Sequence, residues 1–152
     1  MAVNTVNGLD EIKALVGKDL GKSSWLEVTQ DRVNLFADAT GDHQWIHVDP
    51  ERATAGPFGA PIAHGYLTLS LVIPLFSDLL SVTGTSMGVN YGLDKLRFPS
   101  PVKVGSKIRL GGVVDKVEDF PGGIQMYVDL TIEVEGQAKP ALVARAIYRH
   151  YA

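Results

Sequence analysis

Residues 62–73 read Ile62-Ala-His-Gly-Tyr-Leu-Thr-Leu-Ser-Leu-Val-Ile73, and this stretch decides the fold. Its apolar residues fall on nearly every face of a helix, so we expect the helix to be buried on most sides. Pro74 follows directly, and because proline has no backbone N–H to donate, a kink or an early end of the helix is expected there. The rest of the chain must therefore supply apolar surfaces that enclose one central helix.

The sequence after this helix changes to a period of two. Apolar residues alternate with polar ones through residues 126–135, which is typical of a strand with one buried face in an antiparallel sheet. Residues 85–98, 106–118 and 141–151 are further candidate strands, joined by stretches rich in Pro and Gly. Together these elements predict an α+β fold, in which a curved antiparallel sheet of about five strands wraps around a long central hydrophobic helix.

The first part of the chain adds shorter elements. Residues 9–16 carry apolar side chains at helical spacing, and residues 23–28 form a candidate strand. Thr29 offers an N-cap for a second helix that ends at Gly41. Asp49 offers an N-cap for a short third helix, with Pro50 at its first position. No linker or repeat interrupts this order, so we expect one domain over residues 1–152.

Composition excludes several classes of protein. The 152 residues carry a net charge of −3, which argues against a nucleic-acid or membrane-surface partner. There is no cysteine, so disulfides and thiolate chemistry are excluded. The N-terminus lacks the pattern of a signal peptide, and the longest apolar stretch is too short and too polar to span a membrane. A cytoplasmic location is the resulting prediction.

The segment between the second and third helices is the candidate active site. Asp42 lies five residues before His47, and Gly41 directly precedes the acid. A tight turn that aims both side chains inward would form an acid–base pair. Taken alone, Asp42 could simply cap a turn, and His47 could be a hydrogen-bonded, partly buried histidine.

These residues also carry a resemblance. The pattern Phe36-Ala-x-x-Thr-Gly-Asp-x-x-x-Ile-His, followed by His64-Gly65 at the start of a hydrophobic helix, resembles the MaoC-like, (R)-specific enoyl-CoA hydratase family, in the branch of nodulation protein N. The resemblance implies the hot-dog fold and reversible hydration of trans-2-enoyl-CoA to (R)-3-hydroxyacyl-CoA. It further implies a homodimer with its active sites near the interface. One departure is Gln44-Trp45, where the family usually has Asn-Pro; Trp45 cannot stiffen the turn as proline does, unless packing pins it.

The chemistry assigns roles to these residues. Asp42 would act as general base on a water molecule that His47 orients, and the pair would return a proton to C2. The backbone N–H of Gly65 would stabilise the thioester oxyanion, because a residue without Cβ allows close approach. We expect the apolar central helix to keep the site dry and the Asp42 carboxylate buried. Lower-ranked candidates for substrate contact are Trp45, His64, Tyr66 and Ser70.

Alternatives remain at this point. His43 and His47 have the i,i+4 spacing of a zinc-binding helix, but Gly41 and Pro50 argue against a helix there, so we expect no metal and no cofactor. The substrate could be carried by acyl-carrier protein instead of CoA, with dehydration as the working direction. A hot-dog thioesterase is a weaker enzymatic alternative, and a non-catalytic acyl-binding module is the alternative outside enzymes.

Overall fold

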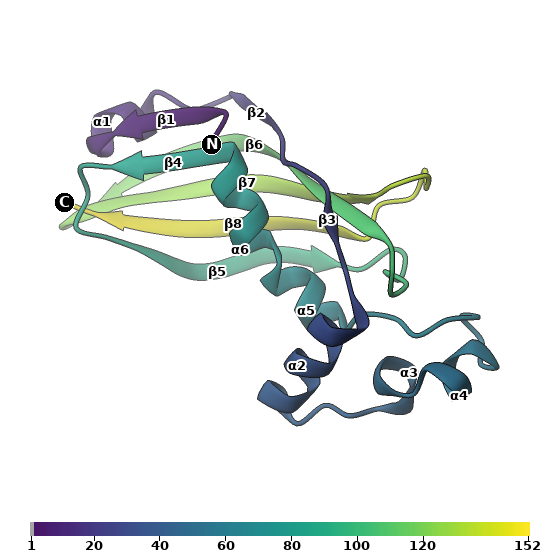
Figure 1. Ribbon diagram of the computed structural model, residues 1–152. Helices are drawn as coiled ribbons and strands as arrows, with labels where there is room; N and C mark the ends of the chain where they lie inside the picture. The colour runs from purple at the N-terminus through teal and green to yellow at the C-terminus, as the bar shows by residue number, and fades with distance from the viewer. Residues whose placement is uncertain (1) are drawn as a thin grey trace.

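The computed structural model describes residues 2–152, and its main feature is a curved antiparallel sheet (Figure 1). Five strands follow one another across the sheet, and a short sixth strand, β3 (Leu26–Glu27), also pairs with β6. Their order is β2 (Asp19–Lys22), β6 (Lys107–Phe120), β7 (Gly123–Val134), β8 (Leu142–Tyr151) and β5 (Met87–Arg97). The predicted α+β architecture is confirmed, and β5 forms one edge of the sheet.

The long strands form because their apolar residues alternate. In β7, the side chains of Met126, Val128, Leu130 and Ile132 are all buried on the face that meets the helices. A two-residue connection joins β6 to β7, and Gly122 there has φ +97°, a conformation that favours glycine. The predicted strands in this half of the chain therefore agree with the structure to within a few residues.

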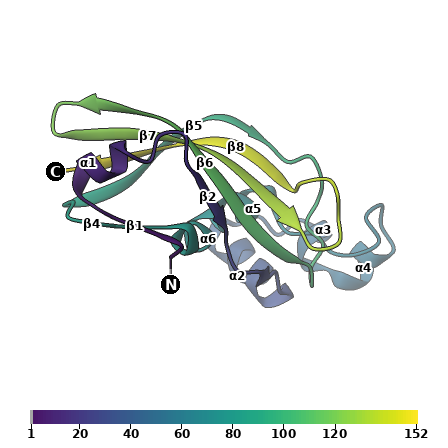
Figure 2. The same ribbon diagram turned by 90° about the horizontal axis from the view of Figure 1, so that it is seen from above.

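The central helix is two short helices, α5 (Gly65–Ser70) and α6 (Val72–Leu79), which cross one face of the sheet (Figure 2). The break lies at Ser70–Leu71, one turn before Pro74. Because Pro74 cannot donate to the carbonyl of Ser70, the helical ladder is interrupted there, although the chain resumes a helix that passes through the proline. The buried side chains facing the sheet include Leu67, Leu71, Val72, Leu75 and Leu79.

The expectation that this helix is buried on most sides is wrong for the single chain. Tyr66 is 70% exposed and Ile73 is 48% exposed, so one side of α5 and α6 is open. The neighbouring edge strand β5 is also exposed at ten of its eleven positions. An apolar helix face and an unpaired sheet edge therefore lie open on the same side of the fold.

The N-terminal segment departs furthest from the sequence prediction. Strand β1 (Asn4–Asn7) pairs in parallel with β4 (Leu80–Thr83), and neither strand was predicted. Helix α1 (Gly8–Lys13) is shorter than expected. The candidate strand at residues 23–28 is reduced to the two residues of β3, while β2 was missed. Within residues 2–152, no helix has both the length and the apolar character needed to cross a membrane.

Three helices hold the candidate site beside the start of α5. Helix α2 (Gln30–Thr40) is capped by the Thr29 hydroxyl, which accepts a hydrogen bond from the Arg32 N–H, and it ends at Gly41 with φ +79°. Helix α4 (Pro50–Thr54) is capped by Asp49 in the same way. Both caps were predicted. Between them lies α3 (Trp45–Val48), a single helical turn where the sequence predicted none.

Candidate active site

His47 lies on α3, and its ring is almost fully buried, with 6% exposed. Its Nδ1 lies 2.6 Å from the backbone carbonyl oxygen of Ile62. Because a carbonyl can only accept, Nδ1 must carry a proton and donate it. In the neutral ring, Nε2 is then left as a hydrogen-bond acceptor. The Ile62 carbonyl thus selects the tautomer and fixes the direction of the ring.

Burial also sets the charge of this ring. Desolvation lowers the pKa of His47 below the ordinary value of 6.5, and the nearby His64 adds to the lowering. The hydrogen bond to Ile62 and the carboxylate of Asp42 act in the opposite direction but do not outweigh burial. His47 is therefore mainly neutral near pH 7, with a free lone pair on Nε2.

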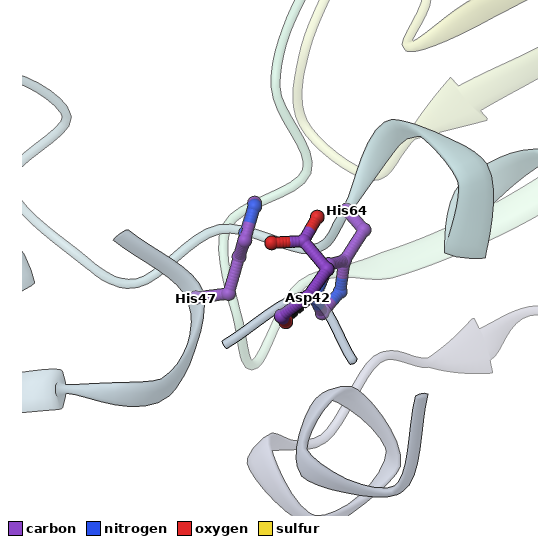
Figure 3. A group of neighbouring side chains, drawn as sticks. All are labelled: Asp42, His47 and His64. Atoms are coloured by element: carbon purple, nitrogen blue, oxygen red, sulfur yellow. Dashed lines mark hydrogen bonds between the residues drawn. The ribbon is translucent and has the colours of Figure 1, made fainter. Parts of the chain in front are cut away.

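Asp42 follows the C-cap of α2 directly, and one of its carboxylate oxygens points toward the His47 ring (Figure 3). The ligand atoms offered by Asp42, His47 and His64 lie within 4.8 Å of one another. Asp42 Oδ1 also accepts a long hydrogen bond of 3.4 Å from the Gln44 N–H, the turn-capping contact weighed from the sequence. The residue is exposed, so the expected burial of this carboxylate is wrong for the single chain.

His64 connects both members of the pair. Its Nε2 donates a hydrogen bond of 3.0 Å to the backbone carbonyl oxygen of Asp42, and its ring stacks on His47 with 3.9 Å between centroids. The ring is only 3% exposed, and its Nδ1 is buried without a hydrogen-bond partner among the described residues. His64 occupies the N-cap of α5, but its side chain does not cap the helix.

Asp42, His47 and His64 line a pocket of about 440 Å³. The other lining residues are Phe36, Thr40, Gly65, Tyr66 and Phe98. Gly65 is the first residue of α5, so its N–H has no acceptor one turn earlier in the helix. The Phe98 ring covers this glycine so closely that a Cβ there would lie 3.0 Å from the ring. A reacting group could therefore meet an acid, an imidazole and a free backbone donor in one pocket.

A second, largely apolar cavity of about 340 Å³ lies one turn further along the central helix. It runs between the helices and strands β5 and β8, and it is lined by Leu69, Ser70, Val72, Ile73, Asn90, Gly92, Leu93, Leu130, Ala146, Ile147 and Tyr148. Burial raises the pKa of Tyr148 to about 12, so this hydroxyl stays neutral. The cavity offers a hydrocarbon chain an apolar surface and no charge.

The lower-ranked candidates lie in different places. Tyr66 lines the pocket of Asp42, whereas Ser70 lines the apolar cavity and donates its hydroxyl to the Tyr66 carbonyl at 2.7 Å. Trp45 is not among the residues that line either cavity, and its ring packs on Gly56 and Arg52. Their predicted contact with substrate stays a prediction.

Two residues that position or line the site escaped the sequence prediction. The Gln30 amide donates to the carbonyl of His47 at 2.8 Å and so holds α3 against α2. Phe98 comes from the segment after β5, more than 50 residues from Asp42. No local pattern marks either residue, because both act through contacts between distant parts of the chain.

A metal site can be tested against the same geometry. One carboxylate and two imidazoles could bind a divalent transition metal. However, the rings of His47 and His64 stack at 25°, so their in-plane lone pairs run in nearly parallel planes and do not converge on one ion. His43 lies outside α3 and pairs with Asp38 at 2.9 Å, a hydrogen bond that raises the pKa of His43. The absence of a metal remains a prediction, now supported by this geometry.

Comparison with known proteins places the chain among relatives. Residues 11–135 match the family model described as MaoC like domain. The chain is 52% identical over 151 residues to 3-hydroxyacyl-thioester dehydratase Z of Mycobacterium tuberculosis, covering 99% of this chain and 100% of that protein. It is 46% identical over 143 residues to nodulation protein N of Rhizobium leguminosarum bv. viciae, covering 91% and 88%.

A solved structure shares the fold. The (R)-hydratase from A. caviae involved in PHA biosynthesis superposes with a TM-score of 0.71 and 25% sequence identity, over 88% of this chain and 94% of that one. The predicted hot-dog fold and the predicted resemblance are both confirmed by these matches. The pocket at the start of α5 is therefore the candidate active site of a fold that other proteins use for hydration and dehydration.

Proposed function

This chain belongs to the MaoC-like domain family, and from that premise we propose that it catalyses the reversible hydration of trans-2-enoyl-CoA to (R)-3-hydroxyacyl-CoA. Relatives are named as dehydratases and hydratases, and the chain is accordingly a hydro-lyase. The observation that carries the proposal is the fixed tautomer of His47, which turns a free Nε2 acceptor toward the pocket that holds Asp42.

Two acceptors suit one water molecule. The neutral His47 Nε2 and the Asp42 carboxylate can each accept one hydrogen of the same water, at about 2.8 Å. The oxygen lone pair is then free to attack C3 of the substrate. Asp42 takes the proton as general base while the O–C3 bond forms and the C2–C3 π electrons move toward the thioester oxygen. Delivery of that proton to C2 completes the addition, and the reverse steps remove water.

The developing negative charge needs a donor. The N–H of Gly65 supports this role, because it is free within the helix and its residue lines the pocket that holds Asp42. The apolar cavity beyond Ser70 would take the acyl chain, since it begins one helical turn from the pocket. His64 would act by positioning, through the Asp42 carbonyl and the His47 ring.

We also propose that the working unit is a homodimer joined along β5. This strand is an unpaired sheet edge with exposed apolar side chains, which soluble proteins usually cover. A second copy there would also cover the open side of α5 next to the pocket. Such cover would give Asp42 the drier setting that the single chain does not provide.

The test is hydration of crotonyl-CoA, followed as loss of the enoyl absorbance. Asp42→Asn and His47→Gln should each lower kcat by about 10² or more. The chain supplies a matched control in Asp38 and His43, an exposed acid–imidazole pair with the same five-residue spacing. Asp38→Asn and His43→Gln should leave kcat within about twofold, because neither residue lines the pocket.

Other outcomes decide between the alternatives. Equal hydration rates for the wild type, Asp42→Asn and His47→Gln would remove the catalytic pair. No turnover by the wild type would favour an acyl-binding module. Release of free CoA without hydration would favour a thioesterase. A much higher kcat/KM with crotonyl-acyl-carrier protein than with crotonyl-CoA would move the substrate from CoA to the carrier protein while retaining the chemistry.

A further inference from the structure

The one-turn helix α3 carries His47, and such a short helix is not stable by itself. Its position must come from contacts with the rest of the chain. The backbone supplies two contacts, since Gln30 donates to the His47 carbonyl and the Ile62 N–H donates to the Ile46 carbonyl. Both contacts lie toward α2 and the start of α5. Neither of these two bonds reaches α4, which follows α3 after the single residue Asp49.

Trp45, the first residue of α3, supplies that contact. The Arg52 guanidinium from α4 stacks over its ring at 4.3 Å from the centroid. Just after the C-terminus of α4, Gly56 meets the ring so closely that a Cβ would lie 2.9 Å from Cζ3. Since real Cβ atoms do not approach other atoms this closely, a side chain at position 56 would force the tryptophan ring to move. The Ala53 carbonyl oxygen, at 3.3 Å, is a looser second neighbour.

We infer that Trp45 is a positioning residue: wedged between Arg52 and Gly56, it fixes α3 against α4 and thereby fixes the His47 ring. The ring acts through packing and does not touch the substrate. This inference rests on the proposed function to the extent that His47 takes part in catalysis. It adds an assignment for Trp45, Arg52 and Gly56, which stand outside the pocket itself.

The backbone suggests a way to replace the ring. Gln44 has φ −58° and ψ 139°, the extended conformation that a residue before proline adopts. Position 45 is the first residue of the helix, where proline is well tolerated because an N–H there has no helical partner. Trp45→Pro should therefore stiffen the same turn without any packing on Gly56. Gly56 has no positive φ, so alanine there is opposed by its neighbours and not by its backbone.

The experiment compares Trp45→Ala, Trp45→Pro, Gly56→Ala and the double variant Trp45→Pro/Gly56→Ala in the crotonyl-CoA assay. Trp45→Ala should lower kcat about tenfold or more with KM nearly unchanged, since small displacements of a reacting group are costly. Trp45→Pro should recover most of that loss. Gly56→Ala should lower kcat in the wild type but have little effect beside Trp45→Pro. Trp25→Ala is the control, because Trp25 carries the same arginine stack at 4.3 Å, from Arg109.

A second readout does not depend on turnover. The His47 ring can be titrated by NMR in each folded variant. Its pKa should rise toward 6.5 in Trp45→Ala, as water reaches the loosened ring, and stay low in Trp45→Pro and Trp25→Ala. If the wild type does not hydrate the thioester, the proposed function fails while this titration still tests the role of Trp45.

Three results would overturn the inference. A higher KM with unchanged kcat in Trp45→Ala would make the ring a substrate contact. If Gly56→Ala lowers kcat equally in the wild type and in Trp45→Pro, the packing of Trp45 on Gly56 does not position His47. Failure of Trp45→Pro to recover kcat would lead to the same conclusion. Should Trp45→Ala fail to fold by circular dichroism, the comparison of Gly56→Ala in the two backgrounds decides alone.

Discussion

The imidazole rings of His47 and His64 stack with centroids 3.9 Å apart and planes 25° from parallel. His64 simultaneously donates a hydrogen bond of 3.0 Å to the carbonyl of Asp42. The buried His64 side chain therefore contacts both the His47 ring and the backbone of Asp42. Asp42 lies just after α2 and His47 lies in α3, and His64, at the N-cap of α5, contacts both residues.

This relationship predicts the effect of His64→Phe. Phenylalanine keeps a flat ring against His47 but cannot donate to the Asp42 carbonyl, so the acid loses its tether. We expect kcat to fall about tenfold while KM changes little, because binding surfaces are retained. His150→Phe is the matched control, since within residues 2–152 His150 also has a buried Nδ1 without a hydrogen-bond partner but lies on β8 outside the pocket. Unchanged kcat in His64→Phe would contradict a positioning role.

The lowered pKa of His47 predicts the pH dependence. Burial disfavours the charged ring, so the neutral form that leaves Nε2 free persists as the pH falls through 6.5. The NMR titration midpoint of His47 should therefore lie below 6.5, and kcat/KM should be kept at pH 6.5 and be lost only at lower pH. A midpoint at or above 6.5 would show that the ring is not desolvated as described.

The free energy of unfolding should also decrease as the pH falls. Burial lowers the pKa of both His47 and His150 in the folded chain. The unfolded chain then binds protons at these residues at a higher pH than the folded chain does. This contribution to the free energy of unfolding is present above pH 6.5 and is lost as the pH falls below that value. Urea midpoints measured from pH 7.5 to 5 should decrease, and His150→Phe should flatten part of the decrease.

The fold was largely readable because its long elements carry strong periodicity. The strands β6 to β8 each contain enough alternating residues to define one buried face. The caps at Thr29 and Asp49 were also visible, because capping depends on neighbouring residues alone. In contrast, β1 and β2 have four residues each and form only because partners distant in sequence lie beside them.

The candidate site also has features that the sequence predicted and features that it did not. The Asp42–His47 spacing stands in the sequence, but the tautomer of His47 depends on the Ile62 carbonyl, which no side-chain pattern records. The helical turn α3 escaped prediction because tertiary contacts, with Gln30 and with Ile62, override the weak local preference. The Trp45 ring packs on Gly56 and Arg52, which is the packing that the sequence analysis required of a turn without proline.

The apolar cavity predicts selectivity for acyl length. Gly92 lines this cavity, and a Cβ there would meet nothing within 4 Å, so Gly92→Val should extend into open space without strain. The added side chain should lower kcat/KM for 2-octenoyl-CoA about tenfold while crotonyl-CoA changes less than about twofold, since only the longer chain needs the filled volume. An equal loss for both substrates would place the acyl chain elsewhere.

The edge strand β5 predicts the last outcome. If two copies pair along β5, the protein should elute as a dimer in size exclusion with light scattering, and the double variant Met87→Lys/Val89→Lys should be monomeric. Lysine at an edge opposes pairing because charge repels the second strand and resists desolvation. Val143→Lys is the matched control: Val143 is 43% exposed, comparable with Val89 at 37%, but its strand β8 is already paired on both sides.

The monomeric variant should also lose most of its activity, because the open side of α5 beside Asp42 would stay wet and weaken each electrostatic contact in the pocket. A monomeric wild type with full turnover would show that one chain builds the whole site, and the exposed face of β5 would then need another explanation.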